Sequence, residues 1–292
     1  MYSECTLCPR KCAVNRHLST GFCNSPDSAV VNLAKLHHGE EPIISGTRGS
    51  GTVFFAGCNL RCVFCQNHTI SRDGNRGQSY SAEALSDLYI NLQSDGAHNI
   101  NLVTPMHFAP TIAKSLRLAH NNGLSIPVAV NTGGYDLPET IELLRDEVDI
   151  FMPDFKYWTS RTASRYSNAP NYPEVAKEAI SKMFDLVGEP VLDSDGMLQK
   201  GIIVRHLMLP GMLFETGKIL EYLCKTYGDK IYISLMSQYT PIATLDLPEE
   251  LQKPVRASSY ERMCDFLADL GQTRGFTQDS DSCGDAMIPD FE

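Results

Sequence analysis

The feature that most constrains this chain is a regular alternation of short apolar and longer amphipathic segments between residues 51 and 236. Six apolar runs have the length of buried strands: 52–57, 99–104, 126–132, 148–153, 201–209 and 230–236. Amphipathic stretches of helical length separate them, at residues 82–96, 110–123, 137–147, 171–188 and 214–228. Strands that alternate with helices pair in parallel through right-handed crossovers. Because six units are too few for an eight-stranded closed barrel, the pattern predicts an α/β fold, an open partial (β/α)6 barrel that binds ligands at the carboxyl ends of its strands.

Three further segments surround this barrel, whose expected bounds are residues 51–240. Residues 1–24 are Cys-rich and too short for a hydrophobic core of their own, which predicts a small metal-binding segment. Residues 25–50 have poor periodicity and are predicted to be a connector. Residues 241–292 are expected to hold one helix, at 258–270, followed by a loose acidic tail.

Charge and hydropathy exclude two classes of partner. The chain of 292 residues has a formal net charge of −10 and no cluster of Lys and Arg, which nucleic-acid binding requires. It has no apolar run long enough to span a membrane, and its start lacks the apolar region of a signal peptide. We therefore expect a soluble, cytoplasmic protein without a nucleic-acid or membrane partner.

Three of the ten cysteines follow the first predicted strand in the loop GCNLRCVFCQN. Cys58, Cys62 and Cys65 have the spacing C-x3-C-x2-C, and three thiolates on one short loop can hold a [4Fe–4S] cluster. The fourth iron then lacks a protein ligand and is open to a reactant, as in a catalytic zinc site. A zinc knuckle is the alternative, but zinc usually takes paired C-x2-C motifs and no second pair follows Cys65.

A second group of cysteines lies in the first segment: Cys5, Cys8, Cys12 and Cys23, with the spacing C-x2-C-x3-C-x10-C. Four thiolates suit a zinc ion that folds a segment too small for its own core. They suit equally a second iron–sulfur cluster that relays electrons or anchors a substrate. Free thiols are the third interpretation, although four clustered thiols would oxidise readily. The spacing leaves zinc and a cluster both open.

Polar residues also follow the other predicted strands. Asp154 and Lys156 are two positions apart, so both side chains point to one face of an extended segment; a surface ion pair is the alternative. Arg205 is predicted to point into the barrel and its neighbour His206 outward. The remaining candidates are Thr104 and His107 after the second strand, Asn131 with Gly133 and Gly134 after the third, and Gln238 after the sixth. His107 has a structural hydrogen bond as its alternative role, and Gly133 and Gly134 a simple turn.

Four segments together resemble the radical S-adenosylmethionine (AdoMet) superfamily, and within it a branch related to the pyruvate formate-lyase activating enzyme: CTLCPRKC…GFC, SGTVFFAGCNLRCVFCQNHTIS, DIFMPDFKY and VRHLMLPG. The resemblance spans about residues 5–240. It implies that the open iron binds the amino and carboxylate groups of AdoMet. Reductive cleavage then forms a 5′-deoxyadenosyl radical that abstracts hydrogen from a substrate. The implied activity is that of a radical AdoMet oxidoreductase, with an electron donor such as flavodoxin or ferredoxin as partner.

The resemblance also implies roles for individual residues. Phe64 is expected against the adenine, Asp154 and Lys156 at the polar groups of AdoMet and the substrate, and Arg205 at the AdoMet carboxylate. Asn131 and the backbone of Thr104 complete the expected cofactor site. Thr104 begins the sequence TPMH where the activating enzymes have a Gly-Gly-Glu stretch, and Gln238 lies near a position where they often carry His.

These two departures leave the substrate open. A glycyl-radical activase would act on a partner protein, whereas the departures favour another peptide or a small molecule. A non-catalytic iron–sulfur or zinc scaffold is the alternative from a different functional class. The intact cysteine loop and the polar residues at the strand ends count against that scaffold.

Overall fold

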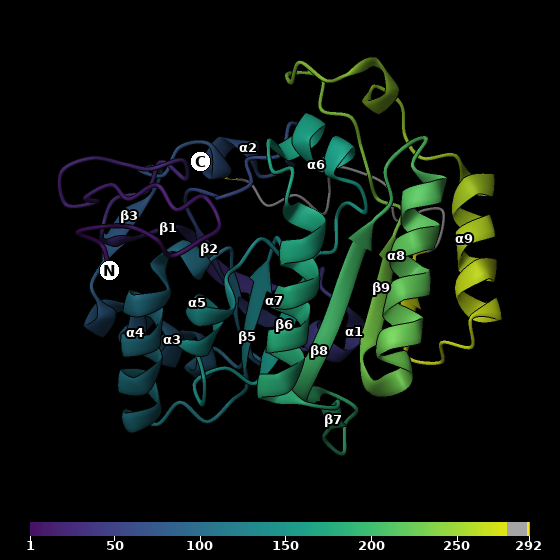
Figure 1. The fold of residues 1–292 in the computed structure, drawn as a ribbon. Coiled ribbons are helices and arrows are strands. Elements are labelled where there is room, and N and C mark those ends of the chain that lie inside the picture. Colours follow the sequence, from purple (N-terminus) through teal and green to yellow (C-terminus); the bar gives the residue numbers. More distant parts are fainter. Residues whose placement is uncertain (279–290, 292) are drawn as a thin grey trace.

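The computed structural model describes residues 1–278 and residue 291, and within them the chain forms a ten-stranded open sheet. The strand order is β10-β9-β8-β6-β5-β4-β2-β1-β3, and β7 pairs only with β8. The two edge strands do not pair with each other, so the sheet does not close. The predicted open partial barrel is therefore confirmed (Figure 1).

All six predicted strands are present and pair in parallel, and they follow one another across the sheet in the order of the sequence. They are β2 (Ser50–Phe55), β4 (Ile100–Val103), β5 (Val128–Thr132), β6 (Ile150–Pro153), β8 (Leu198–Leu207) and β9 (Tyr232–Met236). A further parallel strand, β10 (Gly275–Thr277), extends the sheet beyond β9 and was not predicted, since three residues carry too little periodicity. A short strand, β7 (Val191–Leu192), runs antiparallel to β8.

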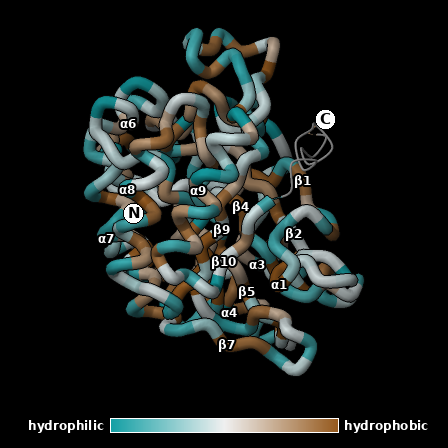
Figure 2. Tube along the Cα trace, turned by 90° about the vertical axis from the view of Figure 1, so that its right-hand side faces the viewer, coloured by the Kyte–Doolittle hydropathy of each residue, from teal (hydrophilic) through white to brown (hydrophobic). Residues whose placement is uncertain are grey.

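Helices cover the outer face of the sheet, and Figure 1 shows α7 and α8 in front of the strands, with α4 at the left of the view and α9 at the right. Their apolar faces pack against the outward side chains of the strands, such as Val130 and Val204, in one large core. Hydrophobic residues are concentrated along the central strands, while many outer turns are hydrophilic (Figure 2).

The helices near the predicted stretches are α3 (Ala82–Ser94), α4 (Ala109–Asn121), α5 (Pro138–Glu142), α7 (Tyr172–Val187), α8 (Leu213–Thr226) and α9 (Ala257–Asp269). Three α-helices were not predicted: α1 (Pro42–Ser45), α2 (His68–Ser71) and α6 (Ser160–Ser167).

The segment predicted as a connector contributes a strand of nine residues, β1 (Ala29–His37), which pairs antiparallel with β2 and with β3 (Gln78–Tyr80). The pairing register shifts between Val31 and Leu33, as at a β-bulge. A bulge breaks the period of two by which a strand is identified in a sequence, which explains the missed strand.

The same segment closes the inside of the barrel at its amino-terminal end. Helix α1 (Pro42–Ser45) places Ile44 in a separate inner core with Ala129, Ile150 and Ile203, which point inward from β5, β6 and β8. Any cavity in the barrel must therefore lie toward the carboxyl ends of the strands. The predicted loose tail lies outside the described residues, apart from Gln278 and Phe291; the Phe291 ring lies 5.3 Å from that of Phe54.

Candidate active site

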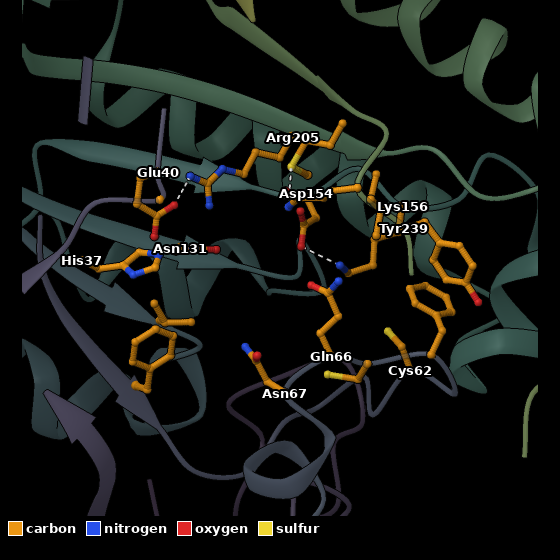
Figure 3. Close-up of a pocket in the computed structure, with 18 residues that line it drawn as sticks. His37, Glu40, Cys62, Gln66, Asn67, Asn131, Asp154, Lys156, Arg205 and Tyr239 are labelled. Atoms are coloured by element: carbon orange, nitrogen blue, oxygen red, sulfur yellow. Dashed lines mark hydrogen bonds and ion pairs between the residues drawn. The ribbon is translucent and has the colours of Figure 1, made fainter. Parts of the chain in front are cut away.

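Two adjoining cavities lie at the carboxyl ends of the parallel strands. The smaller one, about 170 Å³, is bordered by all three cysteines of the loop after β2. The larger one, about 240 Å³, extends from Cys62 and Cys65 across the barrel to Arg205, Glu40 and His37 (Figure 3). Residues that border both cavities are Cys62, Cys65, Asn67, Val103, Asn131, Asp154 and Lys156.

The cysteine loop is held against the N-terminal segment from its first turn. Gly57 has φ of 83°, and a Cβ atom there would lie 2.0 Å from Ser25 Oγ and 2.7 Å from the Cys23 carbonyl oxygen. Only glycine fits this approach, because the backbone conformation is left-handed and the space is filled. The turn directs Cys58, Cys62 and Cys65 toward the smaller cavity.

Each of the three sulfur atoms accepts a hydrogen bond. The Leu60 amide donates to Cys58 Sγ over 3.4 Å, and the hydroxyls of Ser167 and Ser71 donate to Cys62 and Cys65 Sγ over 3.0 and 3.4 Å. Burial, with the neighbouring Cys62 thiolate, raises the pKa of Cys58 to about 12. Three thiolates in this place therefore need positive charge beside them, which the irons of a cluster supply.

A single metal ion suits the loop less well. A [4Fe–4S] cluster binds its cysteines at separate irons and so spreads the sulfur atoms around a cubane. Three cysteines around a cavity therefore fit a cluster rather than a zinc knuckle.

Asp154 and Lys156 leave the end of β6 and border both cavities. Lys156 Nζ lies 2.6 Å from Asp154 Oδ2, and the two side chains are only 18% and 19% exposed. Burial lowers the pKa of Lys156, but Asp154 and the Cys62 and Cys65 thiolates outweigh it and raise this pKa overall. Asp154 and Lys156 thus form an ion pair, as in the alternative interpretation, but this pair lies inside the candidate site and not on the surface.

Thr104 and Asn131 lie side by side at the ends of β4 and β5, and the Thr104 amide donates to the Asn131 carbonyl oxygen over 2.8 Å. Thr104 has φ of 58°, a strained conformation for a β-branched residue. Such strain is concentrated at functional sites, and Thr104 borders the cavity of the cysteines. Gly134, in contrast, has a packing role, since a Cβ atom there would lie 2.1 Å from the Asp154 carbonyl oxygen.

Aromatic side chains form one end of the larger cavity. Phe64 makes edge-to-face contacts with Tyr166 and Tyr239, with ring centroids 6.3 and 6.0 Å apart. Gln238 borders the same cavity. His107 lies outside it: its Nε2 atom is 2.9 Å from the Ala56 carbonyl oxygen, and burial lowers its pKa to about 3. His107 therefore has the structural role that was its alternative.

Arg205 points into the barrel, as its strand position predicted. Its neighbour His206 points outward, with Nδ1 2.7 Å from the Phe155 carbonyl oxygen and Nε2 3.0 Å from Thr216 Oγ1. The guanidinium of Arg205 is bound by two carboxylates that sequence reasoning missed, Glu40 and Glu41. Arg205 Nε lies 3.0 Å from Glu41 Oε1, and Nη2 lies 2.5 Å from Glu40 Oε2. The expected contact of Arg205 with the AdoMet carboxylate stays a prediction, and these two glutamates compete with it.

The four N-terminal cysteines are close to one another and to the cysteine loop. Burial first, and then the thiolates of Cys23, Cys12 and Cys5, raise the pKa of Cys8 to about 12. Arg10 joins this segment to the site: it donates to the Asn59 carbonyl oxygen over 2.9 Å and to that of Ser167 over 2.8 Å. A ligand at the N-terminal cysteines would thus lie on the segment that packs against the back of the loop.

Comparisons with known proteins identify the family of the chain. The sequence model of the Radical SAM superfamily matches residues 52–198. A relative named "Uncharacterized protein MJ0674", from Methanocaldococcus jannaschii, is 31% identical over 250 residues, which are 82% of this chain and 67% of the relative. The crystal structure of SuiB from Streptococcus suis aligns with a TM-score of 0.53 and 14% identity, over 79% of this chain and 48% of SuiB. At that identity SuiB shows the fold alone, and this chain spans about half of its length.

The chain belongs to the Radical SAM superfamily. Its cofactors are accordingly a [4Fe–4S] cluster and AdoMet, and the cysteine loop beside the two cavities fits both. Its chemistry is radical chemistry and requires a reductant. Among the described residues, no helix combines the length and the hydrophobicity that a membrane crossing needs.

Proposed function

We propose that this chain is a radical AdoMet enzyme whose cluster is held by Cys58, Cys62 and Cys65. When bound, cluster and AdoMet supply a 5′-deoxyadenosyl radical that abstracts hydrogen from a substrate. One observation carries the proposal: all three cysteines border a cavity that continues, past polar side chains, into a larger cavity with room for further groups.

The residues shared by the two cavities are proposed to orient AdoMet. Asn131, Asp154 and Lys156 lie between the cysteines and the larger cavity, where the polar groups of a ligand bound at the cluster would lie. The Asp154–Lys156 ion pair offers an acceptor and a donor there at a fixed separation of 2.6 Å. Phe64 provides an apolar ring for the adenine, and the backbone of Thr104 borders the cluster side. Arg205 is proposed for the AdoMet carboxylate by resemblance only.

The proposed reaction is hydrogen abstraction from a protein, a peptide or a small molecule. A glycyl-radical activase remains one form of this proposal, with a glycine of a partner protein as the substrate. A flavodoxin or ferredoxin is proposed as the electron donor.

The N-terminal cysteines are proposed to hold a second metal centre. Besides burial, the thiolates of Cys23, Cys12 and Cys5 each raise the pKa of Cys8, so the four sulfur atoms are near enough to interact. This proximity supports a centre that several thiolates share. A zinc ion and a second iron–sulfur cluster both suit four cysteine thiolates, and metal analysis distinguishes them. A cluster there would be packed against the back of the catalytic loop through Arg10, a position suited to electron relay.

Anaerobic reconstitution with iron and sulfide tests the proposed function. After reduction with dithionite, AdoMet should change the EPR signal of the cluster and be cleaved to 5′-deoxyadenosine. Replacement of Cys58, Cys62 and Cys65 together by Ala should abolish cleavage, and cleavage that persists in this variant would refute the assignment. Deuterium transfer from candidate substrates into 5′-deoxyadenosine identifies the substrate and separates an enzyme from a non-catalytic scaffold.

A further inference from the structure

The two segments that carry clustered cysteines have a charge opposite to that of the whole chain. Residues 1–24 and residues 58–77 each contain three basic residues and one acidic residue. The basic residues are Arg10, Lys11, Arg16, Arg61, Arg72 and Arg76. The formal net charge of the chain is −10, so positive charge is in excess only where the metal centres are proposed to lie.

The fold brings part of this charge together at one aromatic ring. The guanidinium carbons of Arg10 and Arg61 lie 3.7 and 5.5 Å from the centroid of the Phe22 ring. Arg61 Nη1 also donates to the Phe22 carbonyl oxygen over 3.1 Å. Lys11 follows Arg10 in the chain and is exposed, and the other three residues are partly exposed. We call these four residues the Phe22 patch.

The positive charge of the Phe22 patch is not neutralised. Among residues 1–278 and 291, none of its three cationic side chains forms an ion pair. Arg10 instead donates to the carbonyl oxygens of Asn59 and Ser167. Carbonyl oxygens satisfy its hydrogen bonds but leave its net charge in place. Cations held this close repel one another and attract an anionic partner.

The Phe22 patch lies beside ligands of both proposed metal centres. The Phe22 amide donates to Cys12 Sγ over 3.3 Å, so the ring is attached directly to the N-terminal cysteines. Arg61 stands between Cys58 and Cys62 in the cysteine loop. A molecule bound to the patch would therefore lie next to both centres.

A molecule at this patch cannot be the substrate. None of the four residues borders either cavity, so the patch is on the outer side of the cysteine loop. Hydrogen abstraction requires that the substrate touches the reactive centre, which the cavities surround. An electron needs no such contact, because it can tunnel through the atoms in between. Reductive cleavage of AdoMet consumes one electron, and another molecule has to supply it.

We propose that the Phe22 patch is the docking surface for the electron donor, and that this donor is an acidic one-electron carrier protein with a flavin or an iron–sulfur cluster. Its carboxylates supply the counter-charges that Arg10, Lys11 and Arg61 lack. One electron leaves the reduced carrier and enters the metal centres of this chain, and no atom is transferred. The proposal rests on the proposed function, because a donor is needed only if the cysteine loop holds a reducible cluster.

Electron transfer from an acidic flavodoxin to the reconstituted protein tests the docking surface. The reduced flavodoxin is mixed with the protein anaerobically, and stopped-flow absorbance gives the second-order rate constant of its reoxidation. This rate constant should fall at least about tenfold between about 0.01 M and about 1 M salt, because the Debye length shrinks from ~30 to ~3 Å. A rate constant that does not depend on salt, or no transfer at all, would overturn the proposal.

A charge series at Lys11 locates the surface. Lys11→Gln should lower the rate constant at low salt, and Lys11→Glu should lower it further, by at least about threefold, the scale of one exposed ion pair. Lys200→Glu makes the same charge change at an exposed residue near the start of β8, at the opposite end of the barrel, and should have little effect. Equal effects at the two lysines would show steering by net charge alone and would contradict docking at the patch.

A small cationic reductant separates docking from damage to a metal centre. Reduced methyl viologen should reduce the wild type and Lys11→Glu at similar rates, and equal slowing with both reductants would contradict docking. Lys11-dependent binding of a short RNA, without electron transfer from flavodoxin, would assign the patch to a nucleic acid instead. The AdoMet-dependent EPR change after dithionite reduction separates the two proposals: if it is present while transfer from flavodoxin ignores salt and Lys11, only the docking surface fails.

Discussion

The hydroxyl group of Ser167 donates a hydrogen bond to Cys62 Sγ over 3.0 Å, and the Tyr157 hydroxyl lies 2.7 Å from Ser167 Oγ. Ser167 ends helix α6, and its carbonyl oxygen also accepts from Arg10 of the N-terminal segment. Three parts of the chain thus meet at one cluster ligand. A hydrogen bond to a thiolate stabilises the more negative, reduced cluster, and so raises its reduction potential.

Removal of this hydroxyl should therefore lower the potential. For Ser167→Ala we expect a shift of about 20–60 mV to more negative values, the one-electron equivalent of a hydrogen bond of about 0.5–1.5 kcal/mol. A redox titration followed by EPR measures it. Ser164→Ala is the control, because Ser164 lies on the same helix and is exposed. An unchanged potential in a Ser167→Ala protein with full iron content would contradict the role of this bond.

Replacement of Cys5 and Cys8 by Ser should remove the second metal centre. We expect a loss of about four irons per chain if the centre is a cluster, and of one zinc if it is structural. Metal analysis of the anaerobic protein distinguishes these results. AdoMet cleavage without substrate should continue if the variant stays folded, since the cysteines of the catalytic loop are intact. Unchanged metal content would mean that these thiols bind nothing.

Arg205→Ala should destabilise the fold strongly. The substitution leaves Glu40 and Glu41 buried without their counter-charge, and breaking a buried ion pair in this way costs about 3–5 kcal/mol. Urea unfolding measures the loss, with the exposed Arg161→Ala as a control. A surface ion pair contributes at most about 1 kcal/mol to the free energy of unfolding. A loss smaller than this would show that the ion pairs of Arg205 with Glu40 and Glu41 are not buried in solution. The AdoMet affinity of the same variant is a separate measurement and tests the expected contact with the AdoMet carboxylate. If Arg205 makes that contact, its loss should weaken the binding free energy of AdoMet by about 1.5–3 kcal/mol.

Asp136 should make the stability depend on pH. Its side chain accepts from Thr132 Oγ1 over 2.5 Å, and burial raises its pKa from 3.8 to about 6. Between these values the folded state holds a proton that the unfolded state has lost, so stability falls as pH rises from about 4 to 6 and then levels off. The penalty at pH 8 is about 3 kcal/mol. Asp136→Asn should therefore be the more stable protein at pH 8, and this advantage should disappear near pH 4 in urea unfolding. An advantage that does not change with pH would contradict the raised pKa.

Local patterns determined much of this protein. The alternation of apolar and amphipathic segments predicted the parallel strands, because a buried strand and a surface helix each impose their own period on neighbouring residues. The cysteine loop could be identified for the same reason, since its three ligands lie within eight residues. Asp154 and Lys156 were found together because an extended segment places residues two apart on one face.

The tertiary structure decided the features that join distant segments. Glu40 and Arg205 are 165 residues apart, and nothing near either residue in the sequence indicates the other. Strand β1 was hidden by its bulge, and only the fold shows that the segment after it closes the barrel and lines the cavity. Ser167 is 105 residues from Cys62, on a helix that was not predicted. Contacts of this kind depend on how the elements pack in three dimensions, and packing leaves no periodic signal in the chain.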